Sequence, residues 1–193
     1  MSDDTTRGTY HRGFYDDLRA PAVAINPPGA DSDPGRDATT GWLLFDATAT
    51  ELIYITYQMP HGWVQEETAN SGVSSPISFH THWHKSTSAT GTVAWRMRYR
   101  YSNLGGVWST WSTPETVTTP QVSDGNTAEQ QALTAFTDIR IPNASISANL
   151  LIELARVGSA DTYAADAVLT DADCHIMINQ PGSADVYTKY HSR

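Results

Sequence analysis

Three histidines in the segment 77–85 have the residue type and spacing of metal ligands. His80, His82 and His84 occupy every second position, and successive residues of a β-strand point to opposite faces of a sheet. The spacing predicts that all three imidazoles share one face, and neutral imidazole is a good ligand for Zn, Ni or Fe. Alternate residues on a strand lie roughly 6–7 Å apart, so two of them reach one ion easily and a third only with strain.

The surrounding sequence weakens a catalytic role for these histidines. A cupin-like metal site would add a glutamate shortly after the His-x-His pair, but no acidic residue follows His84 before Glu115. His175 is the candidate for a more distant ligand. Metal catalysis is therefore the least favoured interpretation. A structural or symmetry-axis metal ion comes next, and histidines that are solvated or lie in an interface are the most favoured.

A basic stripe and nearby tryptophans predict a second functional surface. Arg96, Arg98 and Arg100 alternate along one segment, and Trp108 and Trp111 follow closely enough for guanidinium groups to stack on indole rings. The pattern indicates either a ladder of Arg and Trp side chains that stabilises a sheet face or a patch that binds an acidic partner or a sugar. Glycan binding would use three tryptophans, Trp63, Trp108 and Trp111.

Trp108 to Ser112, WSTWS, resembles the WSxWS signature of cytokine-receptor modules. Those modules have paired cysteines, whereas Cys174 is the only cysteine here. We also find neither a signal-peptide pattern nor an apolar run as long as a membrane span, so we do not assign the chain to that family. Cys174 has apolar neighbours and is predicted to be a small buried hydrophobe, not a nucleophile.

The acidic residues form no convincing catalytic pair. Asp166, Asp171 and Asp173, with Asp161 nearby, could bind Ca²⁺ through oxygen ligands, but neither an EF-hand nor a Gly-rich calcium repeat is present. A solvated acidic face is the favoured interpretation. Phosphate-binding glycine loops and serine nucleophile motifs are also missing from the sequence. We therefore expect a protein that is not an enzyme and has no cofactor, and a structural metal ion is the alternative to the absence of a cofactor.

Strands must position these residues. The segment 77–101 predicts a hairpin with Phe79, Trp83, Trp95 and Tyr99 inside, and with the histidines and arginines together on the outer face. A further hairpin is predicted at 41–48 and 51–59, and an edge strand at 115–123. The last strand is predicted at 164–179, where strict alternation places Leu169, Asp171, Asp173 and His175 on one face.

The composition fits an all-β protein. The 193 residues include 13 Gly, 10 Pro, 6 Trp and 9 Tyr, which favours short strands and turns over helices. We predict an antiparallel β-sandwich, jelly-roll-like, as a single domain at 41–193. It is preceded by an extended N-terminal arm and loop at 1–40, where Pro, Gly and Asp are dense.

The charge balance limits the partners. A formal net charge of −9 argues against general binding of nucleic acid, which needs a basic surface. We expect no nucleic-acid partner, no membrane partner, and assembly in a cytoplasm.

Several segments together resemble a group of small virion structural proteins of tailed bacteriophages. They are Met59-Pro60-His61-Gly62-Trp63, His80-Thr81-His82-Trp83 and Asp161-Thr162-Tyr163, within a resemblance that covers most of 14–183. It implies a virion component that is assembled in the host cytoplasm, most readily a capsid decoration or cement protein that bridges subunits of the major capsid protein. We expect a homo-oligomer, with a trimer as the first guess.

The decoration hypothesis assigns the capsid contact to aromatic and basic side chains. The candidates are Arg7, Tyr10, Arg12, Phe14, Tyr15, Arg19, Arg96, Arg98 and Arg100. Three alternatives stay open: a collar, neck or tail accessory protein, a carbohydrate-binding module that contacts host glycans, and a metal-dependent cupin-type enzyme.

Overall fold

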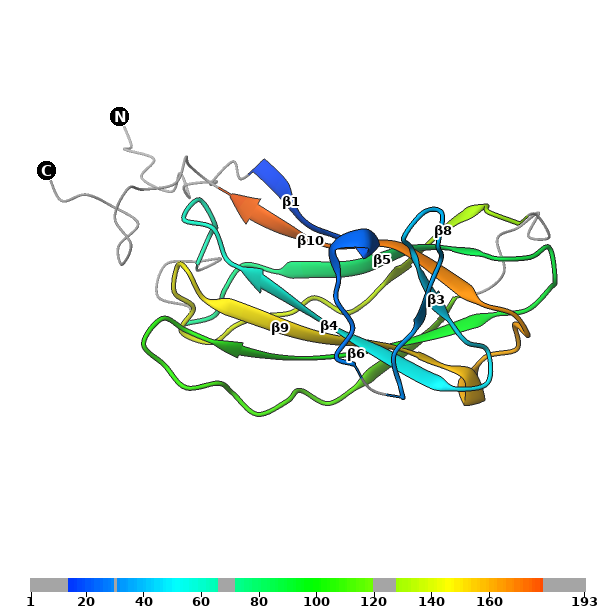
Figure 1. The fold of residues 1–193 in the computed structure, drawn as a ribbon. Coiled ribbons are helices and arrows are strands. Elements are labelled where there is room, and N and C mark those ends of the chain that lie inside the picture. The colour runs from blue at the N-terminus through cyan, green and yellow to red at the C-terminus, as the bar shows by residue number, and fades with distance from the viewer. Residues whose placement is uncertain (1–13, 30, 66–71, 120–127, 179–193) are drawn as a thin grey trace, which may run out of the picture.

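Two antiparallel sheets pack face to face in the computed structural model, which describes residues 14–29, 31–65, 72–119 and 128–178 (Figure 1). Sheet A has the order β2-β3-β10-β5-β8, with β1 also paired to β10. Its strands are β1 (Phe14–Pro21), β2 (Gly35–Arg36), β3 (Leu43–Phe45), β5 (Ile77–Lys85), β8 (Gln131–Ala135) and β10 (Ala167–Ile178).

Sheet B has the order β4-β9-β6-β7. Its strands are β4 (Thr50–Gln58), β6 (Val93–Ser102), β7 (Glu115–Thr119) and β9 (Asn149–Val157). Two short 3₁₀ helices complete the described elements, η1 (Ala22–Ala24) and η2 (Gly158–Ala160). The fold is an all-β, jelly-roll-like antiparallel sandwich, as predicted, and β7 lies at the sheet edge that its sequence indicated. Neither helix in the described ranges is long and apolar enough to cross a membrane.

The core lies between the sheets and is filled by the inward face of each strand. Trp83 of β5 meets Trp95 of β6, with ring centroids 6.2 Å apart, and Phe79 of β5 stacks on Phe136 at 5.6 Å. Phe45 packs edge-on against Trp95 at 5.0 Å. Burying each such side chain contributes about 1.5–3 kcal/mol. The predicted inward set is confirmed, with Tyr99 partly buried against the same core.

The two predicted hairpins are wrong. β5 belongs to sheet A and β6 to sheet B, and likewise β3 and β4 lie in different sheets. Alternation identifies the inward face of each strand. It does not say whether two consecutive strands pair within one sheet or lie in opposite sheets with their inward faces packed against each other. The histidines of β5 and the arginines of β6 therefore lie on opposite outer surfaces of the sandwich, and not on one common face.

Gly91 allows the crossing between β5 and β6. Its φ of 137° is favoured only for glycine, and a Cβ there would lie 2.6 Å from the Cα of Tyr163. The next residue, Thr92, accepts backbone hydrogen bonds from Thr162 and Tyr163. The Asp161-Thr162-Tyr163 segment thus holds this crossing against the sandwich.

An irregularity in β10 reverses the predicted alternation. The pairing with β5 shifts between Leu169 and Asp171, as at a β-bulge. Leu169 therefore faces the core, whereas Asp171, which alternation places on the same face, points outward with Asp173 and His175. Ala172, Cys174 and Ile176 fill the core instead, each 0% exposed.

Part of the predicted arm is a strand of the sandwich. β1 pairs with β10 from Phe14 opposite Ile178 to Pro21 opposite Asp171, and the two ribbons run side by side in Figure 1. Further along, β2 pairs with β3. The first 13 residues, and with them Arg7, Tyr10 and Arg12, lie outside the described residues. The boundary at residue 40 stays a prediction.

Candidate functional site

The outer face of sheet A carries a cluster of two imidazoles and a carboxylate, His80, Asp173 and His175, which we call the His–Asp cluster. One ligand atom from each residue lies within 4.8 Å of the other two. His80 Nε2 is 2.7 Å from Asp173 Oδ1, and the rings of His80 and His175 are 4.5 Å apart at 82°. This set of donors can bind a transition metal ion.

Strand pairing builds the cluster. Asp173 of β10 lies directly opposite His80 of β5, and Asp17 of β1 lies opposite His175. Residues that face each other across antiparallel strands have Cβ atoms about 4.5–5.5 Å apart. The shift in β10 turns the carboxylate outward to meet the imidazoles. The cluster therefore depends on the pairing of β5 with β10 and on one irregularity, while β1 adds Asp17 beside it.

Burial governs the charges within the cluster. His80 and Asp173 are only 6% and 5% exposed. Loss of water lowers the pKa of His80, against the opposing effect of Asp173, and raises the pKa of Asp173, against the effect of its three histidine neighbours. A stable ion pair would shift both pKa values the other way. In both pKa shifts, desolvation therefore outweighs the attraction between the two groups.

The Asp173 carboxylate is left short of partners. Its Oδ1 atom is buried and accepts no hydrogen bond from the described residues, although imidazole nitrogens of His80 and His82 lie 2.7 and 3.7 Å away. Asp17 Oδ1 lies 3.1 Å from His175 Nε2 and steadies the more exposed ring of the cluster.

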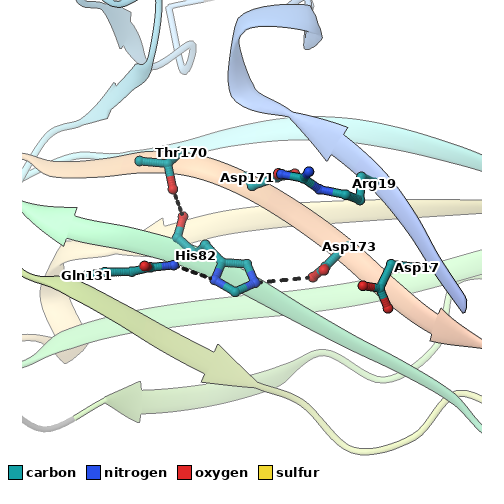
Figure 2. A pocket seen from close by; sticks show the side chains of 7 residues that line it. All are labelled: Asp17, Arg19, His82, Gln131, Thr170, Asp171 and Asp173. Carbon is teal, nitrogen blue, oxygen red and sulfur yellow. Dashed lines mark hydrogen bonds and ion pairs between the residues drawn. The ribbon is translucent and has the colours of Figure 1, made fainter. Parts of the chain in front are cut away.

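A hollow of about 350 Å³ opens beside the cluster (Figure 2). Figure 2 shows His82 between Gln131 and Asp173, and the Gln131 amide lies 2.9 Å from His82 Nδ1. Thr170, at the irregularity of β10, donates to the His82 carbonyl. Arg19 and Asp171 form an ion pair at the other side of the hollow. The lining is Asp17, Arg19, His82, Gln131, Thr170, Asp171 and Asp173.

The predicted histidine triplet shares a strand face but not a site. His84 packs edge-on against Trp42 at 5.3 Å, and its Nδ1 lies 3.0 Å from the Lys85 carbonyl oxygen. It lies outside the His–Asp cluster. The sequence identified His175 as a distant partner but did not identify Asp173 as a ligand, because alternation says nothing about which strands are neighbours.

The outer face of sheet B carries the predicted Arg–Trp ladder, formed by Arg98, Arg100, Trp108 and Trp111. The Arg98 guanidinium lies 4.7 Å from the Trp111 ring, and that of Arg100 lies 5.1 Å from Trp108 and 5.0 Å from Trp111. The hydroxyls of Ser109 and Ser112 accept hydrogen bonds from the backbone of β6. The WSTWS string thus fastens its own loop along that strand.

Glu153 is the acidic centre of this face. It is 2% exposed and binds Arg98 Nη2 at 2.5 Å. Arg96 Nη2 lies at 3.8 Å, and the Tyr54 hydroxyl donates at 3.2 Å. Arg96 and Arg98 are therefore paired within the chain, which argues against their use as free contacts for a capsid.

The glycan-binding prediction loses one of its three residues. Trp63, which follows the Met-Pro-His-Gly turn, packs into the core and is 0% exposed. It therefore cannot contact a sugar. Trp108 is 41% exposed, while Trp111 is partly buried beneath arginines.

The remaining aromatic contact candidates are accessible. Phe14 and Tyr15 of β1 are 70% and 65% exposed. Arg19 has an exposed side chain but is paired with Asp171. These three are the described part of the predicted N-terminal contact surface.

The acidic residues considered for calcium are dispersed. Asp161 binds Arg156 Nε at 2.7 Å, Asp171 pairs with Arg19, and Asp173 lies in the His–Asp cluster. Asp166 lines a separate hollow with Trp42 and His84. The predicted solvated acidic face is therefore wrong for Asp161, Asp171 and Asp173, whose side chains are buried or nearly so.

Arg156 forms a buried polar network that sequence reasoning missed. It is 0% exposed, and besides Asp161 it donates to the carbonyl oxygens of Phe45, Ala165 and Tyr163 at 2.6–2.7 Å. The sequence signal that could have indicated this network is a single arginine within a largely apolar strand. The network joins both sheets to the segment 161–165.

No protein-family model matches the chain, and no curated protein matches it. Among solved structures, the Arthrobacter globiformis T6 isomalto-dextranase, in complex with panose, is 16% identical with a TM-score of 0.42 and covers 82% of this chain and 23% of that chain.

Two structures of infectious bursal disease virus are also similar. The Gx strain structure is 14% identical with a TM-score of 0.39 over 91% of this chain and 35% of that chain. The VP2 subviral particle is 12% identical with a TM-score of 0.38 over 87% and 33%. The chain thus spans at most 35% of these larger chains. Because these scores are low, we take the fold from the strand pairing alone.

Proposed function

We propose that this chain is a non-enzymatic virion structural protein of a tailed bacteriophage, a decoration or cement protein that binds the major capsid protein as a homo-oligomer. The sequence resemblance over 14–183 is one support. The observation that carries the proposal is β1, whose only described strand partner is β10 and whose Phe14 and Tyr15 are 70% and 65% exposed.

An edge strand with exposed aromatic side chains is suited to contact with another chain. Unpaired edge groups can accept an added strand, and Tyr and Phe are enriched at protein interfaces. The residues before β1 include further aromatic and basic candidates, and arms that order on binding cover much surface. We infer that β1 and the preceding arm hold the sandwich on the capsid lattice.

The polar networks fit a structural role for the rest of the sandwich. Arg156 and Glu153 are committed to partners within the chain. A trimer would repeat the β1 contact around one symmetry axis. Neighbouring capsid subunits would then be joined without any conformational change in the sandwich.

Reconstitution on heads that lack the protein tests this proposal. Wild-type protein is added to such heads, and DNA retention is measured after heating. The Phe14→Ala/Tyr15→Ala variant should bind at least about tenfold more weakly, as loss of two interface aromatics predicts, and should protect less. Val107→Ser is the control, because Val107 is 91% exposed in the loop between β6 and β7 of sheet B, whereas β1 belongs to sheet A, and because Val107 carries no predicted contact. Equal heat survival with and without the protein would rule out stabilisation.

Two alternatives are separated by other measurements. A collar, neck or tail protein would occur in the few copies of one ring, whereas a decoration protein would match the capsid lattice, so its copy number per virion decides between them. A carbohydrate-binding role now depends on Trp108, which is 41% exposed, and on Trp111. Glycan binding that is abolished by Trp108→Ala would favour that role.

A further inference from the structure

We propose that His80, Asp173 and His175 bind one Zn²⁺ ion, which links β5 to β10 on the outer face of sheet A. This proposal does not depend on the virion function. The three ligand atoms lie within 4.8 Å of one another and come from adjacent strands of one chain. A single copy therefore supplies three protein ligands, without a symmetry mate.

The donor set fits zinc better than a hard cation. Two imidazoles and one carboxylate are borderline ligands of the kind that zinc prefers, whereas Ca²⁺ and Mg²⁺ take oxygen ligands. Zinc bonds of about 2.0–2.2 Å place tetrahedral ligands roughly 3.3–3.5 Å apart. His80 Nε2 and Asp173 Oδ1, now 2.7 Å apart, would separate slightly and His175 would approach, which side-chain rotations allow.

The partly used hydrogen-bonding capacity of Asp173 is the second argument. Oδ1 is buried and lies 2.7 Å from His80 Nε2, but it accepts no well-aligned hydrogen bond from the described residues, and poorly satisfied buried polar atoms are costly. Asp173 also lies amid three histidines, His80, His82 and His175, that all act on its charge. A divalent cation would satisfy the carboxylate and both ligating imidazoles together.

Neighbouring residues orient the proposed ligands and leave the site open to solvent. Asp17 lies 3.1 Å from His175 Nε2 and orients that ring, the role that an outer carboxylate plays at many zinc sites. The His175 side chain is 45% exposed, and the neighbouring hollow gives an entry path. The Gln131 amide lies 2.9 Å from His82 Nδ1 and holds that ring outside the three-ligand set. We therefore assign the fourth position to water from the hollow.

Zinc titration of the full untagged chain tests the site. Chelator-treated protein is titrated with Zn²⁺ by calorimetry, and Co²⁺ is then used as a spectroscopic probe of tetrahedral coordination. We expect one ion per chain, tetrahedral Co²⁺ bands, and a Tm that rises with zinc concentration, because a ligand of the native state stabilises it.

Variants separate the cluster from the histidine pattern. His175→Ala, at a half-exposed side chain, and Asp173→Asn should each weaken zinc binding by more than about 100-fold, because even outer partners contribute about 10–100-fold. Asp17→Asn should fall within that 10–100-fold range. The matched control is His84→Gln, on the same strand face but outside the cluster, and it should bind like wild type. Circular dichroism confirms that each variant is folded.

Three results would overturn the proposal. They are a wild-type chain that binds no stoichiometric zinc, binding that is unchanged in both His175→Ala and Asp173→Asn, and binding that His84→Gln reduces as strongly as His175→Ala does. The virion tests are separate, because a chain without zinc could still protect heads, and a zinc-binding chain could fail to protect them.

Discussion

The two outer faces of the sandwich each bury a carboxylate, but the two carboxylates differ in their partners. On sheet B, Glu153 is 2% exposed yet meets Arg98 at 2.5 Å and the Tyr54 hydroxyl at 3.2 Å, and the guanidinium groups stack on indole rings. On sheet A, Asp173 is 5% exposed and its Oδ1 accepts no hydrogen bond from the described residues. Glu153 is thus paired with an arginine, which stays charged, whereas the nearest partner of Asp173 is an imidazole, His80 Nε2 at 2.7 Å. The His–Asp cluster therefore has room for one more cation.

Loss of the buried network at the inner side of β9 should produce the largest effect. Arg156→Met leaves Asp161 unpaired and three carbonyl oxygens without their donor, so we expect destabilisation of about 3–5 kcal/mol. Urea denaturation followed by circular dichroism measures it. The double variant Arg156→Met/Asp161→Asn should recover part of the loss, and a loss below that of Glu153→Gln would show that this network is not the main polar support of sheet B.

Removal of the acidic centre of sheet B should come next. Glu153→Gln replaces a charged acceptor beside Arg98, and hydrogen bonds to charged groups contribute about 1.5–3 kcal/mol. A double-mutant cycle with Arg98→Met isolates the pair. A coupling free energy near zero would contradict the view that this face is stabilised by paired charges.

Tyr54 should add a smaller contribution that depends on pH. Burial, and then the negative charge of Glu153, raise the pKa of Tyr54. A raised tyrosine pKa contributes stability below the unfolded value of about 10, and this stability is lost as pH rises through the folded value. Tyr54→Phe should cost about 0.5–1.5 kcal/mol at neutral pH and should flatten the decline of stability above pH ~10. Unfolding midpoints across that pH range give the answer, and an unchanged alkaline decline would contradict the assignment.

The smallest effect is expected on sheet A. Without metal, Asp173→Asn should change stability by less than about 1 kcal/mol, because it keeps the shape and removes a charge that burial disfavours. The same substitution should abolish the rise in Tm with zinc. Thermal denaturation with and without Zn²⁺ compares the two states. A large loss in the absence of metal would show that the His–Asp cluster is already complete, like Glu153.

Sequence patterns predicted the local features and failed on strand neighbours. Period-two alternation identified Phe79, Trp83 and Trp95 as inward residues because one face of every strand must leave water. The spacing of Arg98 and Trp111 predicted their stacking because both lie in one short stretch of chain. The predicted hairpins failed because a short connection can return beside its strand or cross to the opposite sheet, and alternation is the same in both cases.

The sequence by itself determined the strand-rich class, the apolar face of each long strand and the residues of the Arg–Trp ladder, since these follow from periodicity and proximity along the chain. Only the tertiary structure decided that Trp63 is buried and that His84 lies apart from His80. It also decided that Asp173 meets His80 and His175. That meeting requires β10 and β5 in register, together with the shift after Leu169, and such long-range pairing depends on the packing of the whole core.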